Sequence, residues 1–268
     1  MIQMETGIQI LIGQIGKKQP REQVISMGEQ MKAHIDVKVL ASGSKGNCYH
    51  VGDGETALLI ECGIPFKKIQ EKINFRLFEI EGILVSHEHK DHTRAIEKML
   101  SLGIQIYTSA GTAKALNIAE NCFVTTVRSD EIFNIGTFLI KGFNVNHDAA
   151  EPIGYLIRST VTNETLLFFT DTYYLDYTFN CCDYMIVECN FSESILYRNL
   201  MSGVIDEALY KRVYKSHMSI EKLKDFLMAC DLSHLKRIWL AHISDGNSDQ
   251  ALFKREIQRL TGAEVIVT

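Results

Sequence analysis

The stretch GILVSHEHKDH, residues 82–92, says most about this 268-residue chain. An apolar strand there runs directly into the spacing H-x-H-x-D-H, made of His87, His89, Asp91 and His92. Side chains alternate along a strand with a period of two, so His87 and His89 point the same way. The chain then turns into a helix, which lets Asp91 and His92 face the same cavity from another side. A solvated, charged turn is the alternative, but three imidazoles and a carboxylate are costly to bury unless they bind something, so we predict metal binding.

Each metal ion needs more ligands than one turn supplies, and three other strand ends offer them. His147, Asp171 and His242 each lie at the end of a strand, after the runs FNV at 143–145, LLFF at 166–169 and IWL at 238–240. A carboxylate in the place of Asp171 is suited to bridge two cations. Any one of the three taken alone would be read as a core polar group with a hydrogen-bond partner. Together with the turn, they favour a site for two adjacent metal ions.

Composition sets the broad class of the protein. With 46% hydrophobic and 23% charged residues, the chain has the balance of a soluble globular protein with one large core, which excludes disordered and fibrous classes. The sequence has no run of about 20 apolar residues, so we expect no membrane span. The net charge of −5 argues against a broadly cationic protein that coats nucleic acid. It does not exclude a nuclease with a local basic rim.

The cysteines and the first residues indicate the compartment and the domain boundary. Seven cysteines form no C-x-x-C pair, and no export signal is evident, so we expect reduced thiols in the cytoplasm. Thiolate metal ligation is the alternative, but the spacing of thiolate zinc sites is missing. We predict that residues 37–268 form one domain that carries the metal site, and that residues 1–36 are an N-terminal extension whose role the sequence does not indicate.

Strand and helix signals suggest the architecture. Runs of strands are interrupted by crossing helices, which indicates two packed sheets with helices outside rather than a doubly wound parallel sheet. The expected strands are 37–41, 48–51, 56–60, 82–86, 104–107, 123–127, 138–141, 154–158, 165–170, 184–187, 237–241 and 264–268, and the expected helices are 65–73, 93–102, 111–116, 220–229 and 249–260.

With these motifs in this order, the chain resembles the metallo-β-lactamase fold superfamily of hydrolases. The strings LASGSKGNC at 40–48, LLIECG at 58–63, HDAAEPIGY at 147–155 and HISDGN at 242–247 are similar to its YycJ-type (WalJ) bacterial subgroup. The resemblance extends from about Val37 to the C-terminus, and HDAAEPIGY is its most specific element. It implies an α/β (α+β) fold, a four-layer αββα sandwich of mostly mixed or antiparallel sheets, with the metals at one edge of the two sheets.

The resemblance also implies a ligand set. One metal ion would be held by His87, His89 and His147, and the second by Asp91, His92 and His242, with Asp171 bridging the two. Nitrogen and oxygen donors fit Zn²⁺ and also tolerate Mn²⁺ or Fe²⁺. Glu61 replaces the aspartate usual in the superfamily, and we expect Glu61 and Glu188 to support the ligands from behind.

The subgroup is associated with 5′-to-3′ exonuclease activity on DNA. Two cations about 3.5–4 Å apart lower the pKa of a shared water and polarise a phosphoryl oxygen, so we predict a metal-bridging hydroxide as nucleophile, oriented by Asp91. His217 is expected to contact phosphate or act as general acid; the alternative is that it caps the helix that begins near Ser219. Lys45 and Asn47 are expected to contact the substrate, with ordinary turn chemistry as the alternative.

The leading hypothesis is therefore a dinuclear metal-dependent hydrolase, a phosphodiesterase and DNA exonuclease whose partner is nucleic acid. A second hypothesis keeps the metals and changes the substrate to RNA, a small phosphodiester, a thioester or a lactam. The absence of a long insertion between Asp171 and His242, which would clamp nucleic acid, leaves this open. The third is a non-catalytic metal-binding module, against which the complete ligand set argues. The native metal, the polarity of cleavage and the oligomeric state are not fixed by the sequence.

Overall fold

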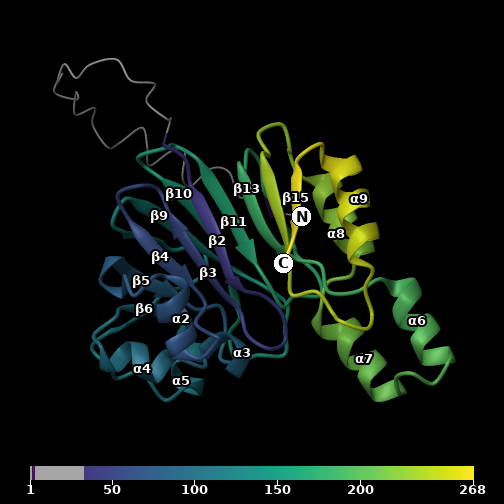
Figure 1. Ribbon diagram of the computed structural model, residues 1–268, viewed down its shortest axis with the longest axis horizontal. Coiled ribbons are helices and arrows are strands. Elements are labelled where there is room, and N and C mark those ends of the chain that lie inside the picture. The colour runs from purple at the N-terminus through teal and green to yellow at the C-terminus, as the bar shows by residue number, and fades with distance from the viewer. Residues whose placement is uncertain (1, 4–32) are drawn as a thin grey trace.

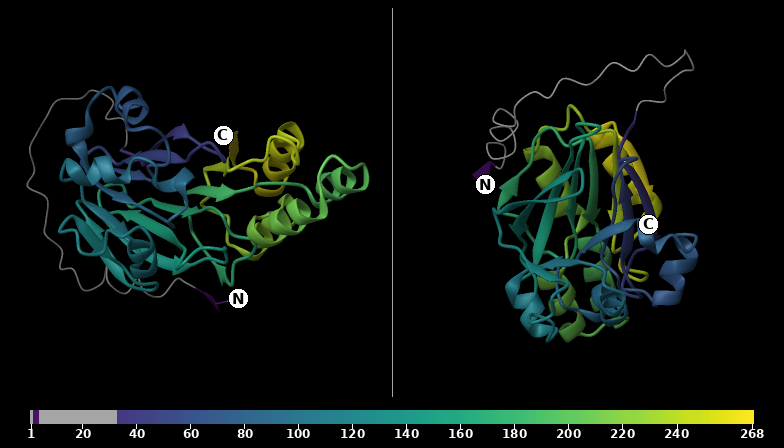
Figure 2. Two further views of the ribbon diagram at one scale, coloured as in Figure 1. Left: turned by 90° about the horizontal axis from the view of Figure 1, so that it is seen from below. Right: turned by 90° about the vertical axis from the view of Figure 1, so that its left-hand side faces the viewer.

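The computed structural model describes residues 2–3 and 33–268. Two β-sheets lie face to face, and helices cover the outer face of each sheet (Figures 1 and 2). The predicted αββα sandwich is confirmed.

The first sheet has six strands in the order β2-β3-β4-β5-β6-β7. Strands β2 to β4 pair antiparallel, and β4 to β7 pair parallel because helices cross between them. Its strands are β2 (Asp36–Ala41), β3 (Cys48–Gly52), β4 (Ala57–Ile60), β5 (Ile80–Leu84), β6 (Ile106–Thr108) and β7 (Val124–Thr126). Its helices are α2 (Phe66–Lys72), the 3-10 turn η1 (Leu77–Glu79), α3 (Lys90–Thr93), α4 (Ile96–Ser101) and α5 (Ala110–Ala115).

The second sheet has seven strands in the order β15-β14-β13-β11-β10-β9-β8. It is antiparallel from β8 to β11 and parallel from β11 to β15. Its strands are β8 (Ile132–Ile135), β9 (Phe138–Asn144), β10 (Ile153–Ser159), β11 (Thr165–Phe169), β13 (Tyr184–Glu188), β14 (Arg237–Ala241) and β15 (Glu264–Val267). Its helices are α6 (Glu193–Met201), α7 (Glu207–Ser216), α8 (Ile220–Ala229) and α9 (Gln250–Thr261), and the short strands β1 (Ile2–Gln3) and β12 (Tyr177–Thr178) pair separately.

The core has three main layers of apolar side chains, and β11 shows how one strand serves two of them. Leu166 and Phe168 face the other sheet, while Leu167 and Phe169 face α8 and α9. A third cluster fills the space between the six-stranded sheet and helices α2, α4 and α5. Because both faces of each sheet are covered, the central strands are apolar along their whole length, and their polar residues gather at the strand ends.

Some elements differ from the sequence expectation. The single helix predicted at 93–102 is divided into α3 and α4, because Thr93 Oγ1 donates back to His89 O (3.0 Å) and the Ala95 N–H donates to Cys62 O (2.9 Å). Strand β8 and helices α6 and α7 were not predicted. The two helices form a hairpin that projects beyond the sandwich and packs on a small cluster of its own (Figures 1 and 2). Parallel pairing is also more extensive than expected.

The predicted extension, residues 1–36, falls mostly on residues 1 and 4–32, which lie outside the described residues. Ile35 is only 2% exposed and packs between the sheets, and β2 begins at Asp36. The domain therefore already includes these two residues, and the separate role of the extension stays a prediction. Within the described ranges, no helix is both long and apolar enough to cross a membrane. All seven cysteines are described, and none of them forms a disulfide.

Candidate metal centre

The predicted ligands meet at one edge of the two sheets, where five segments end or turn. The turn after β5 carries four of them, and the segments after β9, β11 and β14 carry His147, Asp171 and His242. Glu188 is the last residue of β13, between β11 and β14 in the sheet. The side chains fall into groups whose nitrogen and oxygen atoms all lie within 4.8 Å of one another.

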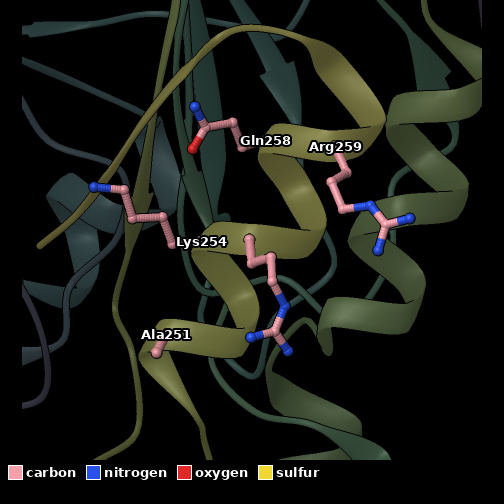
Figure 3. A pocket seen from close by; sticks show the side chains of 5 residues that line it. Ala251, Lys254, Gln258 and Arg259 are labelled. Atoms are coloured by element: carbon pink, nitrogen blue, oxygen red, sulfur yellow. The ribbon is translucent and has the colours of Figure 1, made fainter.

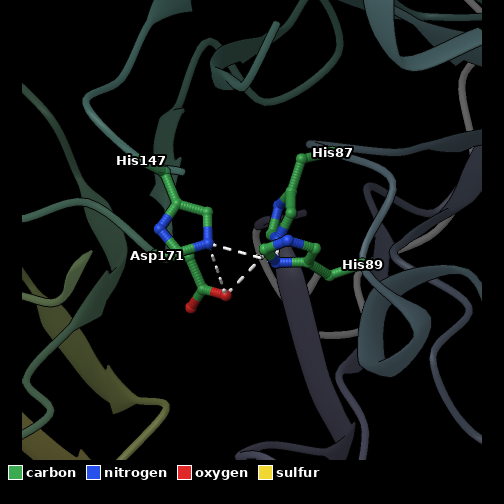
Figure 4. A group of neighbouring side chains, drawn as sticks. All are labelled: His87, His89, His147 and Asp171. Carbon is green, nitrogen blue, oxygen red and sulfur yellow. Dashed lines mark hydrogen bonds and ion pairs between the residues drawn. The ribbon is translucent and has the colours of Figure 1, made fainter. Parts of the chain in front are cut away.

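The first group has three imidazoles and one carboxylate, which point toward a common centre (Figure 4). His89 Nδ1 lies 3.1 Å from His87 Nε2 and 3.2 Å from His147 Nε2. Asp171 Oδ2 lies 3.4 Å from His87 Nε2 and 3.8 Å from His147 Nε2. Four ligands at tetrahedral corners, about 2.1 Å from a zinc ion, stand about 3.4 Å apart. The group therefore has the dimensions of a single four-coordinate metal site.

The imidazoles of this group are prepared to act as ligands. His147 Nδ1 is 3.0 Å from the carbonyl oxygen of Ser216, which can only accept, so Nδ1 carries the hydrogen and Nε2 presents its lone pair to the group. Burial lowers the pKa of His87 to about 3, with His92 acting in the same direction, and burial also lowers the pKa of His147. Both rings are therefore neutral at pH 7.

The second group joins Asp91, His92 and His242 to the same aspartate. His92 Nε2 lies 3.0 Å from Asp171 Oδ2 and 3.5 Å from Asp91 Oδ2, and His242 Nε2 lies 3.6 Å from Asp91 Oδ2. The oxygen Oδ2 of Asp171 thus faces both groups. His242 Nε2 is buried and has no hydrogen-bond partner among the described residues. A buried nitrogen without a partner is costly, and a metal ion would satisfy it, so the donor set fits a divalent cation.

The histidines of the second group have raised pKa values, unlike His87 and His147 of the first group. Burial alone would lower the pKa of His92 and of His242, but the carboxylates beside them, Asp171 first, together outweigh burial and raise both pKa values well above the ordinary range. Burial would raise the pKa of Asp91, but the neighbouring imidazoles of His242 and His92 hold it below its usual value. Protons on these two rings therefore balance the carboxylates, and a divalent cation would displace them.

Two glutamates lie behind the ligands, as the sequence predicted. Glu61 is fully buried, and its Oε1 lies 3.5 Å from His92 Nδ1 and accepts from the Ser86 N–H (3.2 Å). Glu188 is also fully buried, and its Oε1 lies 3.2 Å from His242 Nδ1. Carboxylates in this position fix the orientation of a ligating ring and increase its basicity.

The backbone of the site is strained in three places. Glu61, Asp171 and His242 have φ values of 63°, 50° and 55°, in the left-handed region that residues other than glycine seldom adopt. Gly63 permits a further close approach, because a Cβ there would collide with the carbonyl group of Asp91. These conformations bring the ends of separate strands together around the two groups.

His217 lies beside the two groups rather than inside them. Its Nδ1 is 2.7 Å from Glu188 Oε1 and 3.9 Å from Asp171 Oδ1, and its side chain is 20% exposed. With Asp171, Glu188 and His242, it makes a third cluster that overlaps the second group. The alternative that His217 caps the next helix is wrong, because the side chain of Ser219 caps α8 by accepting from the Lys222 N–H.

The structure separates the two predicted substrate contacts. The Lys45 side chain is 92% exposed, and its Nζ lies 3.7 Å from Asp245 on the surface. Asn47 is fully buried: its Nδ2 donates to Gly43 O and lies 3.2 Å from His92 Nε2, and its Oδ1 accepts from the Gly43 N–H. The prediction that Asn47 contacts phosphate is therefore corrected. Its amide braces the loop against His92, and loop composition alone does not reveal that burial.

Sequence reasoning missed groups that hold the ligands through backbone contacts. The carbonyl oxygen of Ser216 orients His147, and Ser42 Oγ accepts from the N–H of His242 (3.0 Å). Ser42 lies in the string at 40–48, which carried part of the family resemblance. A backbone contact between distant segments leaves no signal in the type or the spacing of residues, so neither role was predictable.

The comparisons with known proteins confirm the predicted resemblance. Residues 56–243 match the Beta-lactamase superfamily domain, so the chain belongs to this family and is a metal-dependent hydrolase. It is 27% identical over 240 residues to Exodeoxyribonuclease YycJ of Bacillus anthracis, covering 84% of this chain and 89% of that protein. Exodeoxyribonuclease WalJ of Streptococcus pneumoniae is 27% identical over 230 residues, covering 80% and 83%.

Solved structures show the same fold. The metallo-beta-lactamase fold protein YhfI from Bacillus subtilis superimposes with a TM-score of 0.65 at 18% identity, covering 87% of this chain and 95% of that one. At this identity the likeness concerns the fold alone.

Proposed function

We propose that this chain is a dinuclear metal-dependent phosphodiesterase that degrades DNA as a 5′-to-3′ exonuclease. The observation that carries the proposal is the shared oxygen of Asp171, which faces two separate groups of ligand atoms. The two relatives named as exodeoxyribonucleases support DNA as the substrate. Seven cysteines without a disulfide support a reducing, cytoplasmic setting.

In this proposal His87, His89 and His147 hold one ion, and Asp91, His92 and His242 hold the other, with Asp171 common to both. Nitrogen and oxygen ligands favour Zn²⁺ and also accept Mn²⁺ or Fe²⁺. When bound, the ions polarise a phosphoryl oxygen and lower the pKa of water.

The chain's own residues would complete the reaction. Asp91 accepts a hydrogen bond from the attacking water and so orients it, since the Asp91 carboxylate lies at the partly exposed side of the second group. His217 donates a proton to the leaving alkoxide. Burial alone would lower the pKa of His217, but the carboxylates of Glu188 and Asp171 together outweigh burial and raise the pKa, which favours the protonated ring that a proton donor needs. The contact of Nδ1 with Glu188 leaves Nε2 for the substrate.

A substrate panel tests this function. Single-stranded, double-stranded and 5′-phosphorylated DNA, RNA, bis-p-nitrophenyl phosphate and nitrocefin are each incubated with the purified chain and Zn²⁺ or Mn²⁺. We expect mononucleotides released progressively from the 5′ end of DNA. Faster cleavage of RNA than of DNA would show that the substrate is RNA. Turnover of nitrocefin without cleavage of DNA would show that it is a lactam. Failure to hydrolyse any member of the panel while binding two metals would favour a non-catalytic module.

A further inference from the structure

A groove lined by basic side chains runs between the loop after β2 and helix α2. Its cations are Lys45, Lys68, Lys72 and Arg94, and we call it the basic groove. All four side chains are exposed, and no carboxylate lines the groove. The whole chain has 33 acidic and 28 basic residues, so this surface is a local excess of positive charge on an acidic protein.

The fold holds these cations in a fixed arrangement. Lys68 and Lys72 are four residues apart on α2 and so lie on one face of that helix. The opposite wall is the loop that carries Lys45. This loop packs tightly on the segment before α2, because Gly46 has a φ of 142° and a Cβ there would collide with the carbonyl oxygen of Gly63. The groove is therefore built by close backbone packing rather than by mobile side chains alone.

The walls of the basic groove are the same segments that hold the second ligand group. Ser42, which lines the groove, accepts the N–H of His242 on its Oγ. In the same loop, the Asn47 N–H donates to the carbonyl oxygen of Asp91 (2.7 Å). Arg94 follows His92 by two residues. A strand of substrate that leaves the metal centre along this side would meet the four cations first.

The cations of the groove are available to bind an anion. Within the described residues, Lys68, Lys72 and Arg94 form no ion pair with a carboxylate. Lys45 lies 3.7 Å from Asp245, but both side chains are more than four-fifths exposed, and such surface pairs exchange readily with a competing anion.

We propose that the basic groove binds successive phosphates of a nucleic-acid strand whose scissile bond lies in the metal centre. The inference rests on the proposed function and deepens it, because it names the surface that holds the rest of the polymer. Lysine binds phosphate as a point charge, and arginine can bind two of its oxygens at once. Contacts of this kind position the strand without reading its bases, so the groove serves a nuclease with no strong sequence preference.

A second basic surface provides a matched control. The outer face of α9 carries Lys254, Arg255 and Arg259 around Ala251 and Gln258 (Figure 3). Helix α9 packs on the seven-stranded sheet, whereas α2 packs on the six-stranded sheet, so the two surfaces lie in opposite outer layers. Two exposed charges can therefore be removed from either place with the same change in net charge.

The test measures binding without catalysis. The full chain is treated with a chelator, and its affinity for short single-stranded DNA, double-stranded DNA and RNA is measured by fluorescence anisotropy over a range of salt concentrations. For the nucleic acid that the parent chain binds most tightly, we expect K68A/K72A to weaken binding on the order of tenfold near 0.1 M salt. If that nucleic acid is single-stranded, loss of two phosphate contacts should also reduce the slope of log affinity against log salt by about 1.4. The charge-conserving K68R/K72R should restore binding, and K254A/R255A should leave it as in the parent.

The possible outcomes distinguish a failure of the groove proposal from a failure of the proposed function. Equal losses in K68A/K72A and K254A/R255A, or no loss in either, would overturn the groove while the parent still binds and cleaves DNA. A parent chain that binds no nucleic acid in any arm overturns both the groove and the proposed substrate. The proposed function alone fails if the groove variants behave as expected but the metal-loaded parent cleaves no nucleic acid.

Discussion

The two ligand groups of the metal centre share one aspartate oxygen but differ in charge. The first group has three imidazoles, of which His87 and His147 are kept neutral by burial. The second has two carboxylates and two imidazoles, His92 and His242, whose pKa values the carboxylates raise. The first group is therefore ready to bind a cation, whereas the second must first release protons. Two sites built at the same edge of one fold should thus fill in a definite order.

Removal of Asp171 should have the largest effect, because both ligand groups should lose their metal ion. Asp171→Ala deletes the oxygen that faces His87 and His92 alike, so we expect both metal ions to be lost. Turnover of bis-p-nitrophenyl phosphate should fall on the order of a thousandfold or more, since several kcal/mol of charge stabilisation disappears. Elemental analysis of the dialysed protein measures the metals. Retention of two ions per chain would show that this residue does not join the sites.

Single ligand changes should separate the groups. His89→Ala removes a candidate ligand of the first group and His242→Ala one of the second, so each variant should keep about half of the metal. Nearly all turnover should be lost in both, on the order of 100-fold, because catalysis uses the two ions together. Unchanged activity of His89→Ala would count heavily against the ligand assignment.

A variant outside both groups should affect turnover and not metal content. His217 contacts Glu188 and lies at the rim of the second group, where we propose that it donates a proton. His217→Ala should lower turnover of an alkyl phosphodiester about 100-fold and leave the metal content intact. Its effect should shrink for a p-nitrophenyl leaving group, which departs without a proton. If the variant instead loses metal, His217 is a ligand and the third cluster is the true second site.

The smallest expected effect is a difference between the two sites in how metal affinity depends on pH. A raised histidine pKa means that the ring keeps its proton to higher pH, so the second site must release protons from His92 and His242 to bind. Its affinity should fall about tenfold for each unit of decreasing pH and for each proton displaced. The first site should keep its ion under the same conditions, because the pKa of His87 is about 3. Calorimetric titration in buffers of different ionisation heat counts the protons released, and simultaneous loss of both ions would contradict the account.

The sequence predicted the chemistry of the centre better than its surroundings. The turn at 87–92 was informative because four candidate ligands lie within six residues, and His147, Asp171 and His242 because each lies at the end of a strand. Strand ends are where polar side chains can leave a core that is covered on both faces. Local pattern and order along the chain were therefore sufficient to gather the ligands.

Other features depend on contacts between distant segments. Asn47 was expected to contact the substrate but is buried, and loop composition does not show that its amide packs on His92. Helices α6 and α7 were missed because they pack on a small cluster of their own rather than on the main core. The basic groove draws its cations from three separate segments, and only Lys68 and Lys72 are spaced so that a shared face is visible in the sequence.

The central claim is that two divalent ions lie on either side of Asp171. Anomalous X-ray diffraction from crystals of the zinc-loaded chain, collected on both sides of the zinc absorption edge, tests it directly. The account predicts two peaks, one among His87, His89 and His147 and the other among Asp91, His92 and His242, each within bonding distance of Asp171. A single peak, or a second peak between Glu188 and His217, would contradict it.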